Sequence, residues 1–102
     1  MKTADFQTQA LPLLHSVHEA LRLDDGSIER LTAVGDALIV ALNFMAESYD
    51  QITDPEARTQ IETTSESMLA ALGVNNMRIA IALQSAAELA QVMSGATEIT
   101  LH

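Results

Sequence analysis

The sequence predicts a single all-α domain over residues 1–102, an antiparallel bundle of about four helices with an extended C-terminal tail. Apolar residues recur at the three- and four-residue spacing of amphipathic helices along most of the chain. The residues from Ala37 to Ala46 (ALIVALNFMA) are apolar almost all the way round, as in a helix that is covered on more than one side. Aromatic residues make up only 3% of the chain and cysteine is absent, so aliphatic side chains and alanine must fill the core.

The first helix is expected to end near residues 21–23. One face of this helix is apolar over the whole length of the helix. This face consists of Phe6, Ala10, Leu13, Leu14, Val17, Ala20 and Leu21. Pro12 lies inside this pattern, where it removes a backbone donor and clashes with the preceding turn. We therefore expect an extended or helical N-terminal arm followed by a helix from about Leu11, with a kinked helix from about Ala4 as the alternative. Residues 24–27 then form a turn in which Ser27 caps the next helix.

The second helix is predicted from about Ile28 to Gln51 and is the longest element. Its primary apolar stripe consists of Ile28, Leu31, Val34, Leu38, Ala41, Leu42, Met45 and Tyr49. A second apolar strip lies roughly opposite and consists of Ala33, Ala37, Val40 and Phe44. Gly35 is on the primary face, where the missing side chain would let another helix cross closely.

Two further helices are predicted after residue 52. Thr53-Asp54-Pro55-Glu56 is a helix start, and the third helix is expected to reach Leu72, with Gly73 as its C-terminal cap. The fourth helix would run from Asn75 or Asn76 to about Ser94, and its expected core face consists of Ile79, Ala82, Leu83, Ala86, Leu89, Ala90 and Met93. Residues 97–102 alternate between polar and apolar residues, which favours an extended tail.

The charge balance limits the classes of partner. Five basic residues against 14 acidic residues give a net charge of −9, and no basic stripe exists that could neutralise phosphates. Direct binding to nucleic acid and to anionic membranes is therefore not expected. The 37–46 run is too short to span a bilayer, and no secretory signal is visible after Met1. We expect a cytoplasmic protein, which the lack of cysteine suits.

No set of residues has the pattern of a catalytic or metal site. His15 and His18 are three residues apart on one helix face and could chelate a metal, but no further ligands accompany them. Asp36, Glu47 and Asp50 share the polar side of the second helix, which predicts a solvated acidic face. The sequence contains no phosphate-binding glycine loop and no activated serine or threonine. We expect a non-enzymatic protein without cofactor or metal.

Self-association through the second strip of the second helix is the leading functional hypothesis. A bundle helix needs one core-facing stripe, and additional exposed apolar surface usually marks an interface. The expected partner is a second copy of the chain in a homodimer or a larger oligomer. The alternative is that the second helix is the central helix of a monomer. The expected interface residues are Ala33, Ala37, Val40, Phe44, Ile81 and Val92.

Other binding functions stay open at the level of the sequence. Acidic residues are concentrated in the first two-thirds of the chain, which would attract another protein with a basic surface or imitate nucleic acid in a basic groove. A bundle cavity lined by Met45, Met68 and Met93 could instead bind a small ligand. In size, charge and lack of catalytic residues the chain is similar to small bacterial or phage regulators, secretion chaperones, antitoxins and inhibitors, although no family motif is present.

Overall fold

The fold is all-helical, as predicted. The computed structural model describes the backbone of residues 2–101 and the side chains of residues 2–95. Within this range the chain forms three helices and no strand: α1 (Thr3–Arg22), α2 (Ile28–Tyr49) and α3 (Pro55–Leu101). The expected number of about four helices was wrong, because residues 55–101 form one helix instead of two.

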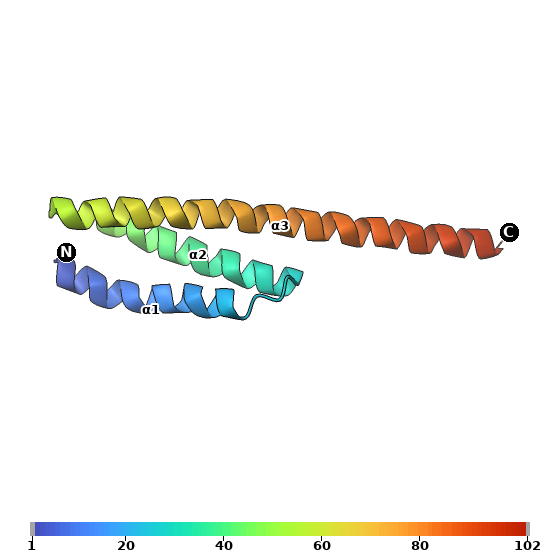
Figure 1. Cartoon of the computed structure of the whole chain (residues 1–102), viewed down its shortest axis with the longest axis horizontal. Coiled ribbons are helices and arrows are strands. Elements are labelled where there is room, and N and C mark those ends of the chain that lie inside the picture. Colours follow the sequence, from blue (N-terminus) through green and yellow to red (C-terminus); the bar gives the residue numbers. More distant parts are fainter. Residues whose placement is uncertain (1, 102) are drawn as a thin grey trace.

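The molecule is a short three-helix bundle from which one helix extends (Figure 1). Helices α1 and α3 run in the same direction, and α2 runs between them in the opposite direction. Both α1 and α3 pack against α2, and the backbones of α1 and α3 approach each other at far fewer positions. Because α1 and α2 have 20 and 22 residues while α3 has 47, the C-terminal half of α3 continues past the bundle. The molecule therefore measures 72 × 19 × 16 Å.

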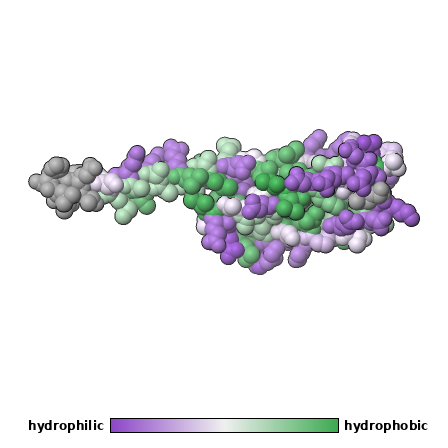
Figure 2. Space-filling model, turned by 180° about the vertical axis from the view of Figure 1, so that it is seen from behind, coloured by the Kyte–Doolittle hydropathy of each residue, from purple (hydrophilic) through white to green (hydrophobic). Residues whose placement is uncertain are grey.

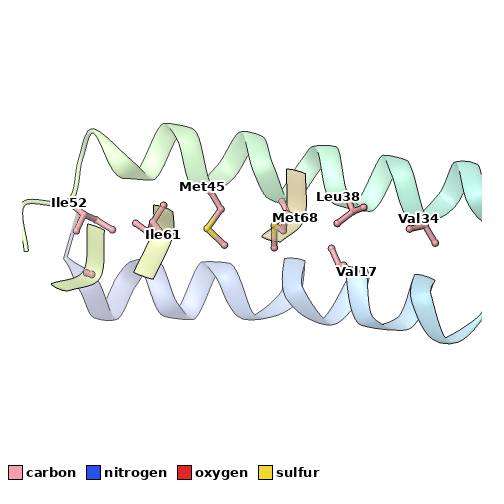
Figure 3. Close-up of a cluster of buried hydrophobic side chains, with 9 residues drawn as sticks. Val17, Val34, Leu38, Met45, Ile52, Ile61 and Met68 are labelled. Carbon is pink, nitrogen blue, oxygen red and sulfur yellow. The ribbon is translucent and has the colours of Figure 1, made fainter. Parts of the chain in front are cut away.

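The core is a single row of aliphatic side chains that lies between the three helices (Figure 3). Most of the primary stripe of α2 is buried, as the periodicity predicted, whereas Ile28 at its first position is partly exposed. The buried cluster contains Val17 from α1, several residues of α2, Ile52 from the connection, and three residues of α3. Its members are Val17, Val34, Leu38, Ala41, Met45, Ile52, Ala57, Ile61 and Met68.

Helix α1 begins at Thr3 and passes through Pro12 without ending. The favoured start of the helix near Leu11 was therefore wrong, and the structure agrees with the alternative of a helix from about Ala4 that contains Pro12. The first turns are fastened to α2, because Ala10 is buried and the Phe6 ring stacks on Phe44 with centroids 5.5 Å apart. These contacts offset the missing hydrogen bond at Pro12, which lies on the exposed side of the helix.

The start of α2 has the predicted cap. Ser27 Oγ accepts a hydrogen bond from the backbone N–H of Arg30 at 3.2 Å, which satisfies one of the orphan donors of the first turn. Gly26 precedes it with φ of +80°, a left-handed conformation that glycine adopts without strain. The helix ends at Tyr49, two residues before the expected end.

The opposite end of the bundle is closed by a polar contact between α2 and α3. The Tyr49 hydroxyl donates a hydrogen bond to Glu62 Oε1 at 2.6 Å. This hydrogen bond to the carboxylate, together with desolvation, raises the pKa of Tyr49. The Arg58 guanidinium lies over the Tyr49 ring, 4.1 Å from its centroid. Helix α3 begins at Pro55, the residue where the sequence predicted a helix start.

Helix α3 is continuous through Gly73, so the predicted C-terminal cap at this residue was wrong. Gly73 does not have a positive φ, and it is exposed on the helix surface. Met68, Leu72 and Asn75 follow one another at spacings of four and three residues, so the buried face of the helix crosses Gly73 in register. Packing of this face on α2 outweighs the cost of a glycine in a helix, which is about 1 kcal/mol.

The extended tail predicted for residues 97–102 is not observed up to residue 101, because α3 ends at Leu101. The helix continues through the period-two pattern of the tail, in which six residues are too few to form a sheet of their own. Residue 102 and the side chains of residues 96–101 lie outside the described part of the chain.

Substitution of Gly73 by alanine tests the continuity of α3. No atom lies within 4 Å of the position that a Cβ would occupy, so Gly73→Ala should raise the free energy of unfolding by about 1 kcal/mol through helix propensity. Urea unfolding at a fixed protein concentration measures this change. A helix that ended at Gly73 in a left-handed cap would instead be destabilised by the same substitution.

Candidate functional site

Asn75 is one of the two residues that fasten the middle of α3 to the rest of the bundle. It is buried, and its Nδ2 donates a hydrogen bond to the Leu31 carbonyl oxygen at 2.8 Å. Gly35 makes this approach possible, because a Cβ at Gly35 would lie only 3.2 Å from Asn75 Nδ2. The close helix crossing predicted at Gly35 is therefore confirmed. The Asn75 Oδ1 atom is buried and has no hydrogen-bond partner among the described residues.

Arg78 is the second fastening residue and lies one turn further along α3. Its Nη1 donates a hydrogen bond to Asp24 Oδ2 at 2.6 Å, and Asp24 Oδ1 accepts from the Gly26 N–H at 2.9 Å. The hydrogen bond from Arg78 lowers the pKa of Asp24, and the Gly26 N–H lowers it further. The α1–α2 turn is thus connected to α3 at the point where α3 leaves the bundle (Figure 1).

The part of α3 beyond this point, residues 80–101, extends past α1 and α2, and we call it the distal segment (Figure 1). From residue 80 to residue 94 every side chain is exposed except Ala82, which is half-buried. Leu89 is 61% exposed and Val92 is 69% exposed. Figure 2 shows hydrophobic surface where this extension joins the bundle, and a mixture of weakly hydrophobic and hydrophilic surface further along the extension. Large exposed apolar side chains that gather on one element often mark a binding surface.

Apolar residues occupy two sides of the distal segment. One side continues the buried face of α3, because Ala82, Ala86 and Leu89 follow Ile79 at spacings of three, four and three residues. We call this side the distal stripe, and it consists of Ala82, Leu83, Ala86, Leu89 and Ala90. Ile81 and Val92, which the sequence analysis assigned to an interface, are 11 residues apart and share the reverse side. Both are exposed.

The second apolar strip expected on α2 is only partly exposed in the structure. Ala33 and Val40 are exposed, and Val40 is exposed by 53%. Ala37 is half-buried and packs against the core of its own chain. Phe44 is half-buried, and its ring stacks on Phe6. The exposed apolar surface of α2 is therefore smaller than the sequence pattern indicated.

The six expected interface residues do not form one patch. Leu38 of α2 and Met68 of α3 belong to the same buried cluster, so the middle of α2 lies beside the middle of α3. Val92 is 24 residues beyond Met68, a distance of about 36 Å along the helix axis. Val40 on α2 and Val92 on the distal segment therefore belong to separate exposed surfaces.

Sequence reasoning missed the exposure of Leu83 and Leu89, which it placed on the core face of a fourth helix. Both residues are more than half exposed. The sequence does contain an indication of this exposure. The heptad-like spacing of buried-type residues continues from residue 68 to residue 93. A stripe of this length is longer than a helix of 22 residues can cover.

The polar candidates do not assemble into a catalytic or metal site. His15 and His18 are exposed on α1. Within the described residues no group of three or more histidine, aspartate or glutamate side chains is placed to hold a metal ion. Asp36 and Glu47 are exposed on α2, and Asp50, the residue that follows this helix, is exposed as well, as a solvated acidic face requires.

The predicted methionine-lined cavity is not formed. Met45 and Met68 are buried in the core, whereas Met93 lies on the distal segment and is exposed. The concave regions are open apolar grooves instead. One groove, of about 380 Å³, runs between α1 and α3 over Met45, and another, of about 500 Å³, runs between α2 and α3.

One helix of the described chain, α2, is long and apolar enough to cross a membrane. The core helix of a folded bundle meets the same criteria, and α2 buries its primary stripe in this way. Comparison of the chain with protein-family models, with curated proteins and with solved structures yields no match.

The ion pair of Arg78 and Asp24 predicts a pH dependence of stability. Because the folded-state pKa of Asp24 lies below its ordinary value of 3.8, the pair stabilises the fold above that value and loses its effect as the pH falls through the folded-state pKa. At neutral pH the Arg78→Met variant should therefore unfold more easily than the wild type, and the difference should vanish in acid. Urea unfolding between pH 2 and pH 7 measures both trends. A difference that is independent of pH would contradict the assignment.

Proposed function

We propose that the chain is a non-enzymatic protein–protein interaction module that acts as a homo-oligomer. The observation that carries the proposal is the exposure of large apolar side chains along the distal segment of α3. Residues 80–101 form a helix that extends beyond α1 and α2. A helical segment of this length without tertiary contacts gains no stability from packing, and a binding partner would supply that packing.

Two surfaces support association. The distal segment exposes large apolar side chains on two sides, with Leu83 and Leu89 on one side and Ile81 and Val92 on the other. The outer surface of α2 adds Val40 and Ala33, which are exposed. We retain α2 in the proposal as a smaller contact, because Ala37 and Phe44 are partly used within the chain.

The proposal also includes a cytoplasmic location and a second class of protein partner. The chain contains no cysteine, which suits a reducing cytoplasm. Its net charge of −9 would attract a protein with a basic surface to the bundle, so a second, different partner is compatible with self-association.

Replacement of Leu89 by glutamate tests the distal segment. The substitution places a charge where an apolar contact is expected, so the Leu89→Glu variant should dissociate at about 10- to 100-fold higher concentration than the wild type. Sedimentation equilibrium over a concentration series measures the change. The control is Gln91→Glu, which adds the same charge on the opposite side of the helix. Equal dissociation constants for Leu89→Glu and the wild type would refute a role for the distal segment.

Replacement of Val40 by glutamate tests α2 independently. Because Val40 is half-exposed and lies outside the buried cluster, the variant should keep the unfolding free energy of the wild type to within about 0.5 kcal/mol. Association should weaken several-fold if α2 contributes to the contact. The matched control is Asn43→Glu, at another exposed position of α2. If both variants associate as the wild type does, α2 has no part in the interface.

A further inference from the structure

The groove between α2 and α3 is an apolar surface of the bundle itself, separate from the distal segment, and we call it the α2–α3 groove. It has a volume of about 500 Å³, and none of its lining residues comes from α1. Its floor is formed by aliphatic side chains of both helices, which are Leu42, Met45, Ala46, Ile61 and Leu69. Leu69 is 57% exposed and Ala46 is exposed as well. The chain therefore leaves part of this floor open to water.

The apolar floor continues along α2 beyond the lining residues. Ile39 is 46% exposed and lies one turn before Leu42, on the same side of the helix. Between Ile39 and Tyr49, which also lines the groove, α2 extends over about 15 Å, since each helical residue rises about 1.5 Å. This length corresponds to about three turns of another helix.

Carboxylates lie along the rim of the groove on both sides. Glu62 lines the groove directly, and Glu66 lies one turn further along α3. On the other side, Asp50 lies one turn after Ala46, with Glu47 next to Asp50 on the outer side of α2. The four carboxylates are exposed. None of them forms an ion pair with another described residue.

Arg58 does not neutralise this rim. Its guanidinium lies over the Tyr49 ring, 4.1 Å from the centroid, and it makes no ion pair within the part of the chain that the structure describes. The groove between α1 and α3 is different, because no charged residue lines it. The α2–α3 groove thus combines an apolar floor with a negative rim.

The negative rim limits the chemistry of an occupant. Phosphates of nucleic acid and anionic lipid headgroups would be repelled by the exposed carboxylates. The distal segment of a second copy offers no opposite charge, since residues 79–102 contain no lysine or arginine. A protein segment with lysine or arginine side chains beside an apolar stripe would complement both the rim and the floor.

The form of the groove favours a helix as this segment. The groove lies between two helices, and the described chain has no strand, so an extended segment would find no sheet edge with which to pair. A helix satisfies its backbone hydrogen bonds internally and presents apolar side chains at spacings of three and four residues. About three turns of such a helix would place a few aliphatic side chains on the floor and basic side chains near the rim.

From these observations we propose that the α2–α3 groove binds an amphipathic helix of a different protein, in which lysine or arginine residues flank an apolar stripe. The inference rests on the proposed function as a protein–protein interaction module, and it gives the bundle a site and a partner class of its own. It does not depend on association through the distal segment.

Binding of a synthetic peptide to the full-length chain tests the chemistry of the occupant. The probe is a fluorescein-labelled peptide of about 14 leucine and lysine residues, with the leucines at helical spacing on one side. The control peptide has glutamate in place of every lysine. Fluorescence anisotropy should give a dissociation constant in the micromolar range for the lysine peptide and at least about tenfold weaker binding for the glutamate peptide.

Variants of the chain locate the peptide on the bundle. Glu66→Lys reverses a rim charge and Leu69→Lys places a repelling charge on the floor, so each should weaken binding at least about fivefold. Glu29→Lys makes the same charge change on α2, about 27 Å along the axis from Glu47. Leu11→Lys is the matched change in the groove between α1 and α3. Both controls should bind the peptide as the wild type does, to within about twofold, and urea unfolding checks that all four variants remain folded.

Sedimentation of the same variants separates this inference from the proposed function. Glu66→Lys and Leu69→Lys should self-associate as the wild type does. Absence of binding to the lysine peptide, equal binding of the two peptides, or equal binding to all variants overturns the α2–α3 groove as the site and leaves self-association standing. Loss of self-association in Leu69→Lys would assign the groove to a second copy and would also overturn the inference. A chain that binds the peptide as expected but is monomeric supports the inference and contradicts the proposed homo-oligomer.

Discussion

The unequal length of the helices is the constraint on which the rest of the structure depends. Helices of 20 and 22 residues can cover about 30–33 Å of a neighbour, whereas a helix of 47 residues is about 70 Å long. The bundle must therefore end halfway along α3. Its end is marked by the buried amide of Asn75 and by the ion pair of Arg78 with Asp24. Every apolar residue placed beyond that boundary must be covered by another chain or remain in water.

The sequence predicted the parts of the fold that depend on local physics. The primary stripe of α2, the cap at Ser27, the helix start at Pro55 and the close approach at Gly35 all follow from periodicity, capping and side-chain size. It did not predict the parts in which tertiary packing overrides a local signal. A glycine such as Gly73 is typical of a helix end, yet the buried face of α3 from Met68 to Asn75 stays in register across it. Pro12 is a helix breaker by the same local rules, yet the stack of Phe6 on Phe44 holds the turns that precede it.

The candidate site was also predicted only in part from the sequence. The sequence identified additional apolar residues on α2 and on the last part of the chain, and Val40, Ile81 and Val92 are exposed in the structure. It did not show that Phe44 has a partner within the chain, because the ring stack joins residues 38 positions apart. It also placed Leu89 in a core, because a periodic face does not reveal whether the same chain or another one covers it. Only the length of the neighbouring helices decides that question.

The most direct test of the account is amide hydrogen exchange of residues 83–94 as a function of protein concentration. If a second copy covers the distal segment, these amides should be protected at high concentration and should exchange almost freely after dilution to the monomer, while the amides of residues 31–45 stay protected in both samples. Protection of residues 83–94 that is equal at all concentrations would show that a single chain maintains this helix alone, and would contradict the central claim.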